Sequence, residues 1–279
     1  MSAAERPVTM RQTVGALSRL DLVCPQCRVT LLCAGESVQC TQCGCRYPMI
    51  DGVLRMLPPL SANEQSTRAA FDFEHRRYQT ASYLRIGQSL IDDWLEEVRL
   101  PASYFRGRRV LDLGCGSGRW SYAMAKLGAD VVSVDVSDGA VETTRRVLGE
   151  VTEPAVIQAS LFQLPFEPGQ FDFVVCWGVM HHTHSTSEAF KAVAPLVKPG
   201  GIFHMMVYER RSPMKVWGTE VVRALLRHVS PEVRYRFCGK LVLENRLAYG
   251  LLRGLVACVP VWELPASLVP ESFYDDCIA

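Results

Sequence analysis

Between Arg108 and Tyr208, apolar segments of strand length alternate with segments of helical periodicity, and this alternation restricts the fold more than any other feature. The apolar segments are RRVLDL, ADVVSVDVS, PAVIQAS, FDFVVCWG and GGIFHMMVY. The helical segments are RWSYAMAKLG, SEAFKAVAPLVKPGG and DGAVETTRRVLGEV, the last of which Ser137 or Asp138 could cap. Continuous apolar strands are covered on both faces, and strands joined by helices pair in parallel. The alternation therefore predicts an α/β fold with a mostly parallel sheet and helices on both faces.

A glycine-rich turn, VLDLGCGSG, follows the first predicted strand and carries Asp112, Gly114, Gly116 and Gly118. The spacing differs from the dinucleotide fingerprint G-x-G-x-x-G, because Arg119 stands where the third glycine would be. The lysine-containing loop that binds nucleoside triphosphates is also absent from this turn. A carboxylate before the turn would repel a pyrophosphate, whereas it suits an ammonium group.

Asp135 ends the second predicted strand, where an acid is placed to accept the hydroxyl groups of a ribose. Together with Asp112, it indicates a ligand that has a ribose and an amino group and no phosphate. S-adenosylmethionine (SAM) meets this description.

Five ordered motifs resemble those of the class I SAM-dependent methyltransferases, over about Phe71 to Tyr208. They are VLDLGCGSG, VVSVDVS, SLFQLPF, FDFVVCWGVMHHTH and LVKPGG. The resemblance implies a Rossmann-like fold, SAM as the cofactor and methyl transfer as the reaction. It also implies a set of cofactor contacts by position: Asp112, Gly114, Gly116, Gly118, Asp135, Val136, Ser160, Leu161, Cys176 and Tyr78.

The resemblance gives these contacts separate roles. The glycines would pass under the methionine part, Asp112 would organise the turn and the amino group, and Asp135 would hold the ribose. Ser160 stands where many relatives have an aspartate for the adenine amino group, and Leu161 with Phe162 would flank the ring. The remaining residues would border the sulfonium and the acceptor, or close over the cofactor: Cys176, Trp177, Gly178 and Tyr78.

Histidines in GVMHHTH follow the fourth predicted strand, and His181 or His182 is the expected general base. An oxygen or nitrogen acceptor needs its proton removed, and a neutral imidazole suits that task near pH 7. His184 is a weaker candidate. The alternative is that these side chains only cap or pack at the start of a helix.

Six of the eleven cysteines lie between Cys24 and Cys45. Cys24, Cys27, Cys40 and Cys43 form two C-x2-C pairs, the spacing of a closed tetrahedral zinc site. Cys33 and Cys45 are expected to be spectators, although Cys45 could replace Cys43. The region resembles the zinc-ribbon-like domain of the activator proteins of tRNA methyltransferases, which implies structural zinc. The five cysteines after Cys45 are expected to be small buried hydrophobic residues.

Four parts are therefore expected: a zinc-ribbon-like domain (1–60), a helical lead-in (61–106), a SAM-binding core (107–209) and a helical tail or lid (210–279). The methyltransferase core normally has seven strands, whereas only five are evident before Tyr208. A shorter chain, strands hidden in the final residues, or a homodimer or other partner covering the sheet edge would each account for the difference.

The favoured function is methylation of an oxygen or nitrogen of a small-molecule acceptor, within a biosynthetic pathway. One alternative is an RNA base methyltransferase that uses the ribbon and the basic stretch 210–253, and another is a non-catalytic SAM-binding partner protein. The net charge of +1 provides no overall attraction to nucleic acid or membrane. No apolar run has the length of a signal peptide core or a membrane span, so a cytoplasmic protein is expected.

Overall fold

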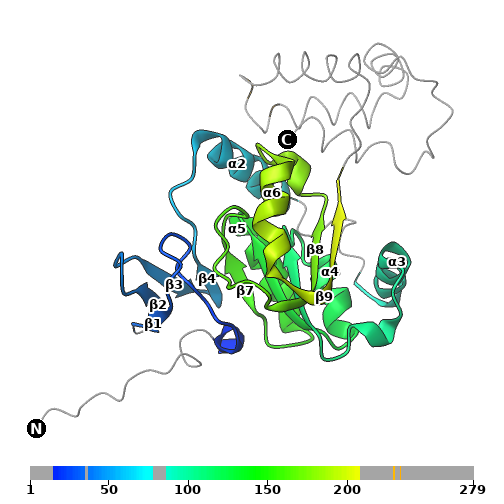
Figure 1. Cartoon of the computed structure of the whole chain (residues 1–279). Helices are drawn as coiled ribbons and strands as arrows, with labels where there is room; N and C mark the ends of the chain where they lie inside the picture. The colour runs from blue at the N-terminus through cyan, green and yellow to red at the C-terminus, as the bar shows by residue number, and fades with distance from the viewer. Residues whose placement is uncertain (1–14, 35–36, 78–85, 208–228, 230–232, 234–279) are drawn as a thin grey trace, which may run out of the picture. The chain divides into compact units, whose positions relative to one another are not determined.

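The computed structural model describes residues 15–34, 37–77 and 86–207, together with Val229 and Val233 (Figure 1). The expectations for Tyr78 and for the tail at 210–279 lie outside these residues. Within the described part, no helix combines the length and apolar character needed to cross a membrane.

Five parallel strands form the central sheet, as the alternating pattern predicted. They are β5 (Arg109–Leu113), β6 (Asp130–Asp135), β7 (Val156–Gln158), β8 (Phe171–Trp177) and β9 (Val197–Met206). Their order is β7-β6-β5-β8-β9, so the chain moves to one side of β5 and then to the other. Ligands of such sheets bind at the carboxyl ends of the strands on either side of this reversal.

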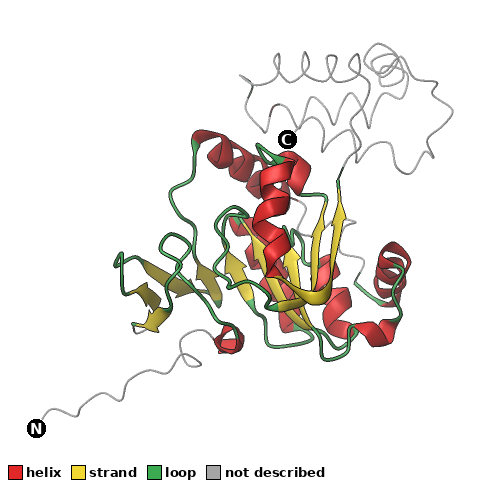
Figure 2. Cartoon of the chain, in the orientation of Figure 1, coloured by secondary structure: helices red, strands yellow, loops and turns green. Residues whose placement is uncertain are grey.

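Helices cover both faces of the sheet, which confirms the predicted Rossmann-like α/β class (Figure 2). They are α3 (Gln88–Val98), α4 (Arg119–Lys126), α5 (Asp138–Gly149) and α6 (Thr186–Val193). Leu111 and Leu113 of β5 share one core cluster with α6, whereas Val110 shares another with Trp94 of α3 and Trp120 of α4. This alternation along one strand is the two-residue period of a sheet buried on both sides.

The helix predicted over SEAFKAVAPLVKPGG ends earlier than expected, at Val193, and the last strand begins earlier, at Val197. Pro195 lacks a backbone donor and its ring crowds the preceding turn, so an α-helix cannot continue through it. Only a short 3-10 turn, η5 (Ala194–Leu196), follows. Phe171 pairs with Val197 and Phe173 with Ile202, so β9 bulges between these pairs. Pro199 was therefore assigned to the wrong element, whereas Gly200 and Gly201, which both predicted segments contained, belong to the strand.

The cysteine-bearing segment forms a small antiparallel meander. Its strands are β1 (Leu31–Cys33), β2 (Ser37–Cys40), β3 (Arg46–Ile50) and β4 (Val53–Arg55). Asp51 and Gly52 join β3 to β4 with φ of 49° and 70°, the left-handed pair that a tight hairpin turn requires. β4 then pairs in parallel with β7, so the meander and the core share one nine-stranded sheet (Figure 1).

Helix α2 (Ala62–Arg77) follows the meander and packs against α5. Its first turn is a capping box, because the Glu64 amide donates to Ser61 Oγ at 3.3 Å and the Ser61 amide donates to Glu64 Oε2 at 2.9 Å. Residues up to Val207 form one compact unit, and a second unit begins at Tyr208. The functional limits at 60 and 106 remain predictions.

Candidate functional site

The glycine turn follows β5 at the carboxyl edge of the sheet. Gly114, Gly116 and Gly118 have φ of 70°, 53° and 79°, a region that residues with a side chain rarely adopt. A Cβ on Gly114 would lie 2.2 Å from Cγ2 of Val179, and one on Gly118 would lie 2.9 Å from Cα of Thr144. Both the backbone conformation and the close packing therefore require glycine.

Asp135 lies beside this turn at the end of β6. Its Oδ2 accepts the Gly116 amide at 3.0 Å, and its Oδ1 accepts the Ser137 amide at 2.9 Å. None of the ion pairs found among the described residues involves Asp135. The carboxylate is thus held by two backbone donors and remains slightly exposed, at 8%. This arrangement brings together the acid and the glycines that the motifs placed in one site.

Asp112 is buried directly below the turn. Its Oδ2 accepts Ser121 Oγ at 2.6 Å, and Ser121 Oγ lies 2.7 Å from Ser133 Oγ. Burial raises the pKa of Asp112 to about 6, the Ser121 hydroxyl opposes this rise, and the charge of Asp135 adds to it. The side chain can therefore change protonation state close to neutral pH.

The loop after β7 places Ser160 at the same edge. Ser160 Oγ donates to Glu64 Oε1 of α2 at 3.2 Å and accepts the Phe162 amide at 3.3 Å. Leu161 is partly buried against the core cluster. Before this loop, the Val136 carbonyl accepts Gln158 Nε2 at 3.1 Å. Helix α2 thus contributes to the site through a residue that the sequence motifs did not single out.

The end of β8 carries a buried core residue, Cys176, followed by a glycine turn at Gly178. Cys176 is fully buried in the hydrophobic core, and this burial raises the pKa of its thiol well above the ordinary value. Its side chain is therefore a neutral packing group. Trp177 Nε1 donates to Glu97 Oε1 of α3 at 3.0 Å, and Gly178 adopts a φ of 76°.

His181 and His182 lie in the short helix η4 (Met180–His182), with ring centroids 4.1 Å apart. The ring of Phe71 on α2 meets His182 edge-on at 5.2 Å. His184 instead stacks on Phe162 at 4.3 Å, and its Nε2 lies 3.0 Å from Glu188 Oε2. His182 therefore contacts α2 and His181 lies beside it, whereas His184 is exposed and pairs with Glu188 on its own segment.

His75 is a site residue that the motif analysis missed. It stacks with Phe71 at 6.3 Å, and its Cε1 lies 3.1 Å from where a Cβ of Gly116 would be. Burial lowers the pKa of His75, against the charges of Asp135 and Asp72, which raise it. The available signal was the i, i+4 spacing of Phe71 and His75 in FDFEHRRY, which puts both on one helical face.

The four cysteines of the two C-x2-C pairs converge, as their spacing predicted. The sulfur atoms of Cys24, Cys27, Cys40 and Cys43 all lie within 4.8 Å of one another, and Cys24 Sγ lies 3.7 Å from Cys43 Sγ. Burial opposes ionisation of Cys24, but the Tyr47 hydroxyl, 3.2 Å away, and nearby amides lower its pKa to about 6. A cluster of this kind offers thiolate ligands to a metal.

The two turns that carry these cysteines have the same backbone pattern. The Cys24 amide donates to the Val29 carbonyl at 2.8 Å, and the Cys40 amide donates to the Cys45 carbonyl at 2.9 Å. Each cysteine carbonyl in turn accepts an amide four residues later, from Arg28 or Gly44. Cys45 lies outside the cluster of four, and its Sγ donates to Gln26 Oε1 at 3.8 Å. This repeated turn geometry presents the sulfur atoms as two matching pairs.

The fold and the glycine turn define a Rossmann-like α/β domain. Residues 111–205 match the family described as "Methyltransferase domain". This part of the chain is therefore similar to methyltransferase domains.

Curated relatives include proteins named ubiquinone biosynthesis O-methyltransferase. The protein from Bordetella avium is 36% identical over 111 residues, covering 39% of this chain and 45% of the relative. The one from Albidiferax ferrireducens is 30% identical over 164 residues, covering 52% of this chain and 63% of the relative. The chain thus spans about half the length of the curated relatives it matches.

Solved structures with similarity to this chain include the YcgJ protein from Bacillus subtilis and the [4+2]-cyclase SpnF. For YcgJ the identity is 24% and the TM-score 0.41, covering 49% of this chain and 59% of that protein. For SpnF the identity is 19% and the TM-score 0.44, covering 58% and 67%.

Proposed function

We propose that this protein is a SAM-dependent methyltransferase that methylates a small-molecule acceptor. The observation that carries the proposal is the junction of Asp135 and Gly116, which joins an acid and a left-handed glycine turn at the carboxyl edge of the sheet. An acid there suits the hydroxyls of a ribose, and a turn free of side chains suits close approach of a ligand. The match of residues 111–205 to the methyltransferase domain supports the same function.

In this proposal the ribose binds at Asp135, and the amino-acid part lies over the glycine turn above Asp112. Val136, Leu161 and Ser160 border the adenine, with Ser160 already oriented by Glu64. The Cys176 side chain serves the core, so its contribution comes from the backbone at the end of β8. SAM supplies a methyl group on a sulfonium that is already a good leaving group, and the protein mainly positions the two reactants.

The acceptor is proposed to lie near η4, where His182 contacts Phe71 of α2 and His181 lies beside His182. A neutral imidazole there removes the proton of an acceptor hydroxyl or amine as its oxygen or nitrogen attacks the methyl carbon. The name of the curated relatives, O-methyltransferase, favours oxygen as the acceptor atom. A role in a biosynthetic pathway is proposed on the same ground.

The cysteine cluster is proposed to hold a structural zinc ion. Zinc–sulfur bonds of about 2.3 Å in a tetrahedral site separate the sulfur atoms by about 3.8 Å. The 3.7 Å between Cys24 Sγ and Cys43 Sγ fits this geometry, and four thiolates would leave no open position for catalysis. The Gln42 and Cys43 amides also lie 3.4 Å from Cys40 Sγ and can stabilise a thiolate there.

The alternatives from the sequence have less support. The basic stretch 210–253, on which RNA binding depends, lies outside the described residues apart from the uncharged Val229 and Val233. Covering of the sheet edge by a homodimer or another partner stays a prediction. A non-catalytic partner protein would have the same cofactor site and would differ only in lacking turnover.

Calorimetric titration with SAM and with S-adenosylhomocysteine (SAH) tests the proposed function. We expect the wild type to bind both ligands and Asp135→Ala to bind them at least about tenfold more weakly, because a charge-assisted pair of hydrogen bonds is lost. Asp172→Ala is a matched control, since this aspartate contacts Arg109 and Lys198 away from the glycine turn. A wild type that binds neither ligand refutes the proposal.

A further inference from the structure

Two arginines of the cysteine-bearing segment reach the two loops that border the adenosine side of the proposed cofactor site. Arg55 is the last residue of β4, and Arg28 directly follows the first cysteine pair. We propose that Arg55 and Arg28 are positioning residues for cofactor binding. Through them, the cysteine-bearing segment holds the loops of the cofactor site in place. This inference rests on the proposed function and deepens it.

Arg55 sets the orientation of the Gln158 amide. Arg55 Nη1 donates to Gln158 Oε1 at 3.1 Å, so the amide oxygen is turned toward the guanidinium. The amide nitrogen therefore faces the other way, where Nε2 donates to the Val136 carbonyl at 3.1 Å and to Asp138 Oδ1 at 3.0 Å. Gln158 is only 3% exposed, so water cannot readily replace these bonds. Arg55 thus acts through Gln158 on the residue that directly follows Asp135.

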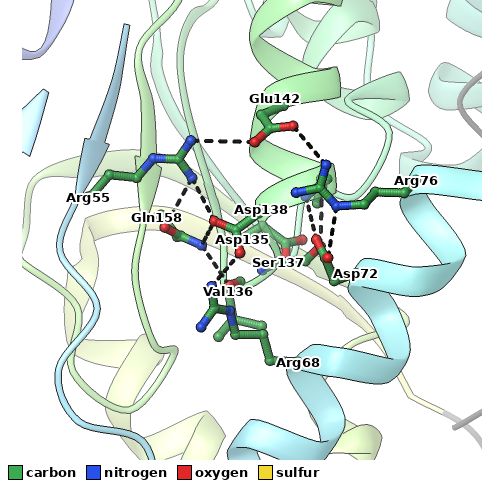
Figure 3. A network of polar contacts seen from close by, with 12 residues as sticks. Arg55, Arg68, Asp72, Arg76, Asp135, Val136, Ser137, Asp138, Glu142 and Gln158 are labelled. Atoms are coloured by element: carbon green, nitrogen blue, oxygen red, sulfur yellow. Dashed lines mark hydrogen bonds and ion pairs between the residues drawn. The ribbon is translucent and has the colours of Figure 1, made fainter. Parts of the chain in front are cut away.

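Arg55 also holds Asp138 from one side while helix α2 holds it from the other (Figure 3). Arg55 Nη1 lies 3.1 Å from Asp138 Oδ1, and Arg68 Nη2 binds Asp138 Oδ2. Asp138 is the first residue of α5 and follows Ser137, whose amide donates to Asp135. Both carboxylate oxygens of Asp138 are therefore bound by guanidinium groups from outside the methyltransferase motifs.

Helix α2 adds a further contact to the same turn. Asp72 Oδ1 accepts the Gly139 amide at 2.7 Å and the Ser137 hydroxyl at 3.3 Å. Residues of β4 and α2 therefore both bind the turn from Asp135 to Gly139, as Figure 3 shows. A binding carboxylate such as Asp135 needs this support, because small displacements of a binding group reduce affinity strongly.

Arg28 holds the second loop, which runs from Ser160 to Phe166. Its Nη1 donates to the Leu164 carbonyl at 2.6 Å, and its Nη2 donates to the Phe166 carbonyl. The Val23 amide donates to the Pro165 carbonyl between them at 3.0 Å. Three successive carbonyls of the loop are thus bound by the segment around the first cysteine pair.

The backbone at Arg28 explains why the contacts of Arg28 with the loop depend on the cysteine turn. Arg28 has a φ of 60°, a conformation that costs energy for a residue with a side chain. The bond from its amide to the Cys24 carbonyl at 2.9 Å closes the turn and stabilises that conformation. A planar guanidinium fork presents two donors in a fixed geometry, which suits arginine to binding both carbonyls.

Calorimetry with SAH on full-length variants tests the inference. We expect Arg55→Gln and Arg28→Gln each to weaken SAH binding about tenfold, the loss that about 1.4 kcal/mol of misplaced contacts produces. Arg109→Gln is the matched control. This partly buried arginine pairs with Asp130, and the two residues begin β5 and β6, at the ends of the strands away from the glycine turn. It should bind SAH as the wild type does.

Two further readouts separate positioning from general stability. Hydrogen exchange should accelerate at residues 135–140 in Arg55→Gln and at residues 160–166 in Arg28→Gln, while β5 stays protected. The KM for SAM should rise in both variants with kcat little changed. If Arg55→Gln does not fold, Asp138→Asn tests the same link, because it keeps the side-chain shape and removes the charge that Arg55 and Arg68 bind.

Each outcome decides the inference. Wild-type SAH affinity in both variants, or an equal loss in Arg109→Gln, would overturn it while leaving the proposed function intact. Failure of the wild type to bind SAH would overturn both.

Discussion

Gly114 and Val179 approach each other so closely that a Cβ on Gly114 would lie 2.2 Å from Cγ2 of Val179. Gly114 belongs to the turn after β5, and Val179 follows β8. These two strands are neighbours, on either side of the point where the chain reverses direction across the sheet. The contact therefore joins the proposed cofactor turn to the segment that carries the proposed base.

Replacing this glycine should destabilise the fold through two separate costs. Gly114→Ala places a side chain at a φ of 70°, which costs roughly 1–2 kcal/mol, and the clash with Val179 adds roughly 1–3 kcal/mol. In the double variant Gly114→Ala/Val179→Ala the clash is reduced and the strain stays, so urea unfolding should show partial recovery. Equal stability of the single and the double variant would contradict this account.

The pKa of Asp112 predicts a pH-dependent affinity for the cofactor. Burial raises this pKa to about 6, so the carboxylate is ionised at pH 7 and largely protonated at pH 5. Only the ionised form attracts the ammonium group of the ligand. SAH affinity should therefore fall as the pH is lowered from 7 to 5, which calorimetry in buffers of different pH can measure. Asp112→Asn should bind weakly with no such dependence, and a parallel pH dependence in both proteins would assign it to another group.

The same raised pKa predicts an effect on stability in the opposite direction. The unfolded chain ionises Asp112 near its ordinary value of 3.8, whereas the folded chain does so at about 6. Unfolding therefore releases a proton between these values, and the contribution of Asp112 to stability falls as the pH rises through this window. Asp112→Asn should then be more stable than the wild type at pH 7, by up to roughly 3 kcal/mol, and show no gain at pH 3. Thermal unfolding at both pH values measures the difference.

The sequence predicted those parts of the protein that depend on local pattern. The five core strands were predicted because continuous apolar runs mark a buried parallel sheet. The convergence of the four cysteines followed from the spacing of two short turns. In each case the relevant signal lies within a few residues.

Features that depend on distant pairing were not predicted. The addition of β4 to the core sheet joins Leu54 to Ile157, and nothing local to either residue specifies that pairing. Arg55 and His75 likewise gain their roles from contacts with Gln158 and with the glycine turn, far away in the sequence. Glu64, assigned to no motif, contacts Ser160 across a similarly long separation in the sequence.

The cysteine cluster predicts a specific dependence of metal content on four positions. Purified protein should contain about one zinc ion per chain, and Cys24→Ser or Cys40→Ser should lose it, because three thiolates and a hydroxyl no longer form a closed shell. Cys33→Ser and Cys45→Ser are matched controls, since neither residue belongs to the cluster of four. Elemental analysis measures the content. Zinc loss in Cys45→Ser together with retention in Cys43→Ser would show that Cys45 is the ligand instead.

The histidines around Phe71 predict two distinct kinetic effects. His181 and His182 lie in η4, so loss of the base there should lower kcat about 10²–10⁴-fold with the KM for SAM little changed. His75 lies against Gly116, so His75→Ala should instead raise the KM for SAM and weaken SAH binding. Asp172→Ala, which contacts Arg109 and Lys198 away from the glycine turn, is a control expected to retain both constants. Steady-state kinetics with an identified acceptor, beside SAH calorimetry, would separate the effects. An unchanged kcat in both His181→Ala and His182→Ala would remove the proposed base, and a fall in kcat confined to His75→Ala would move that role to α2.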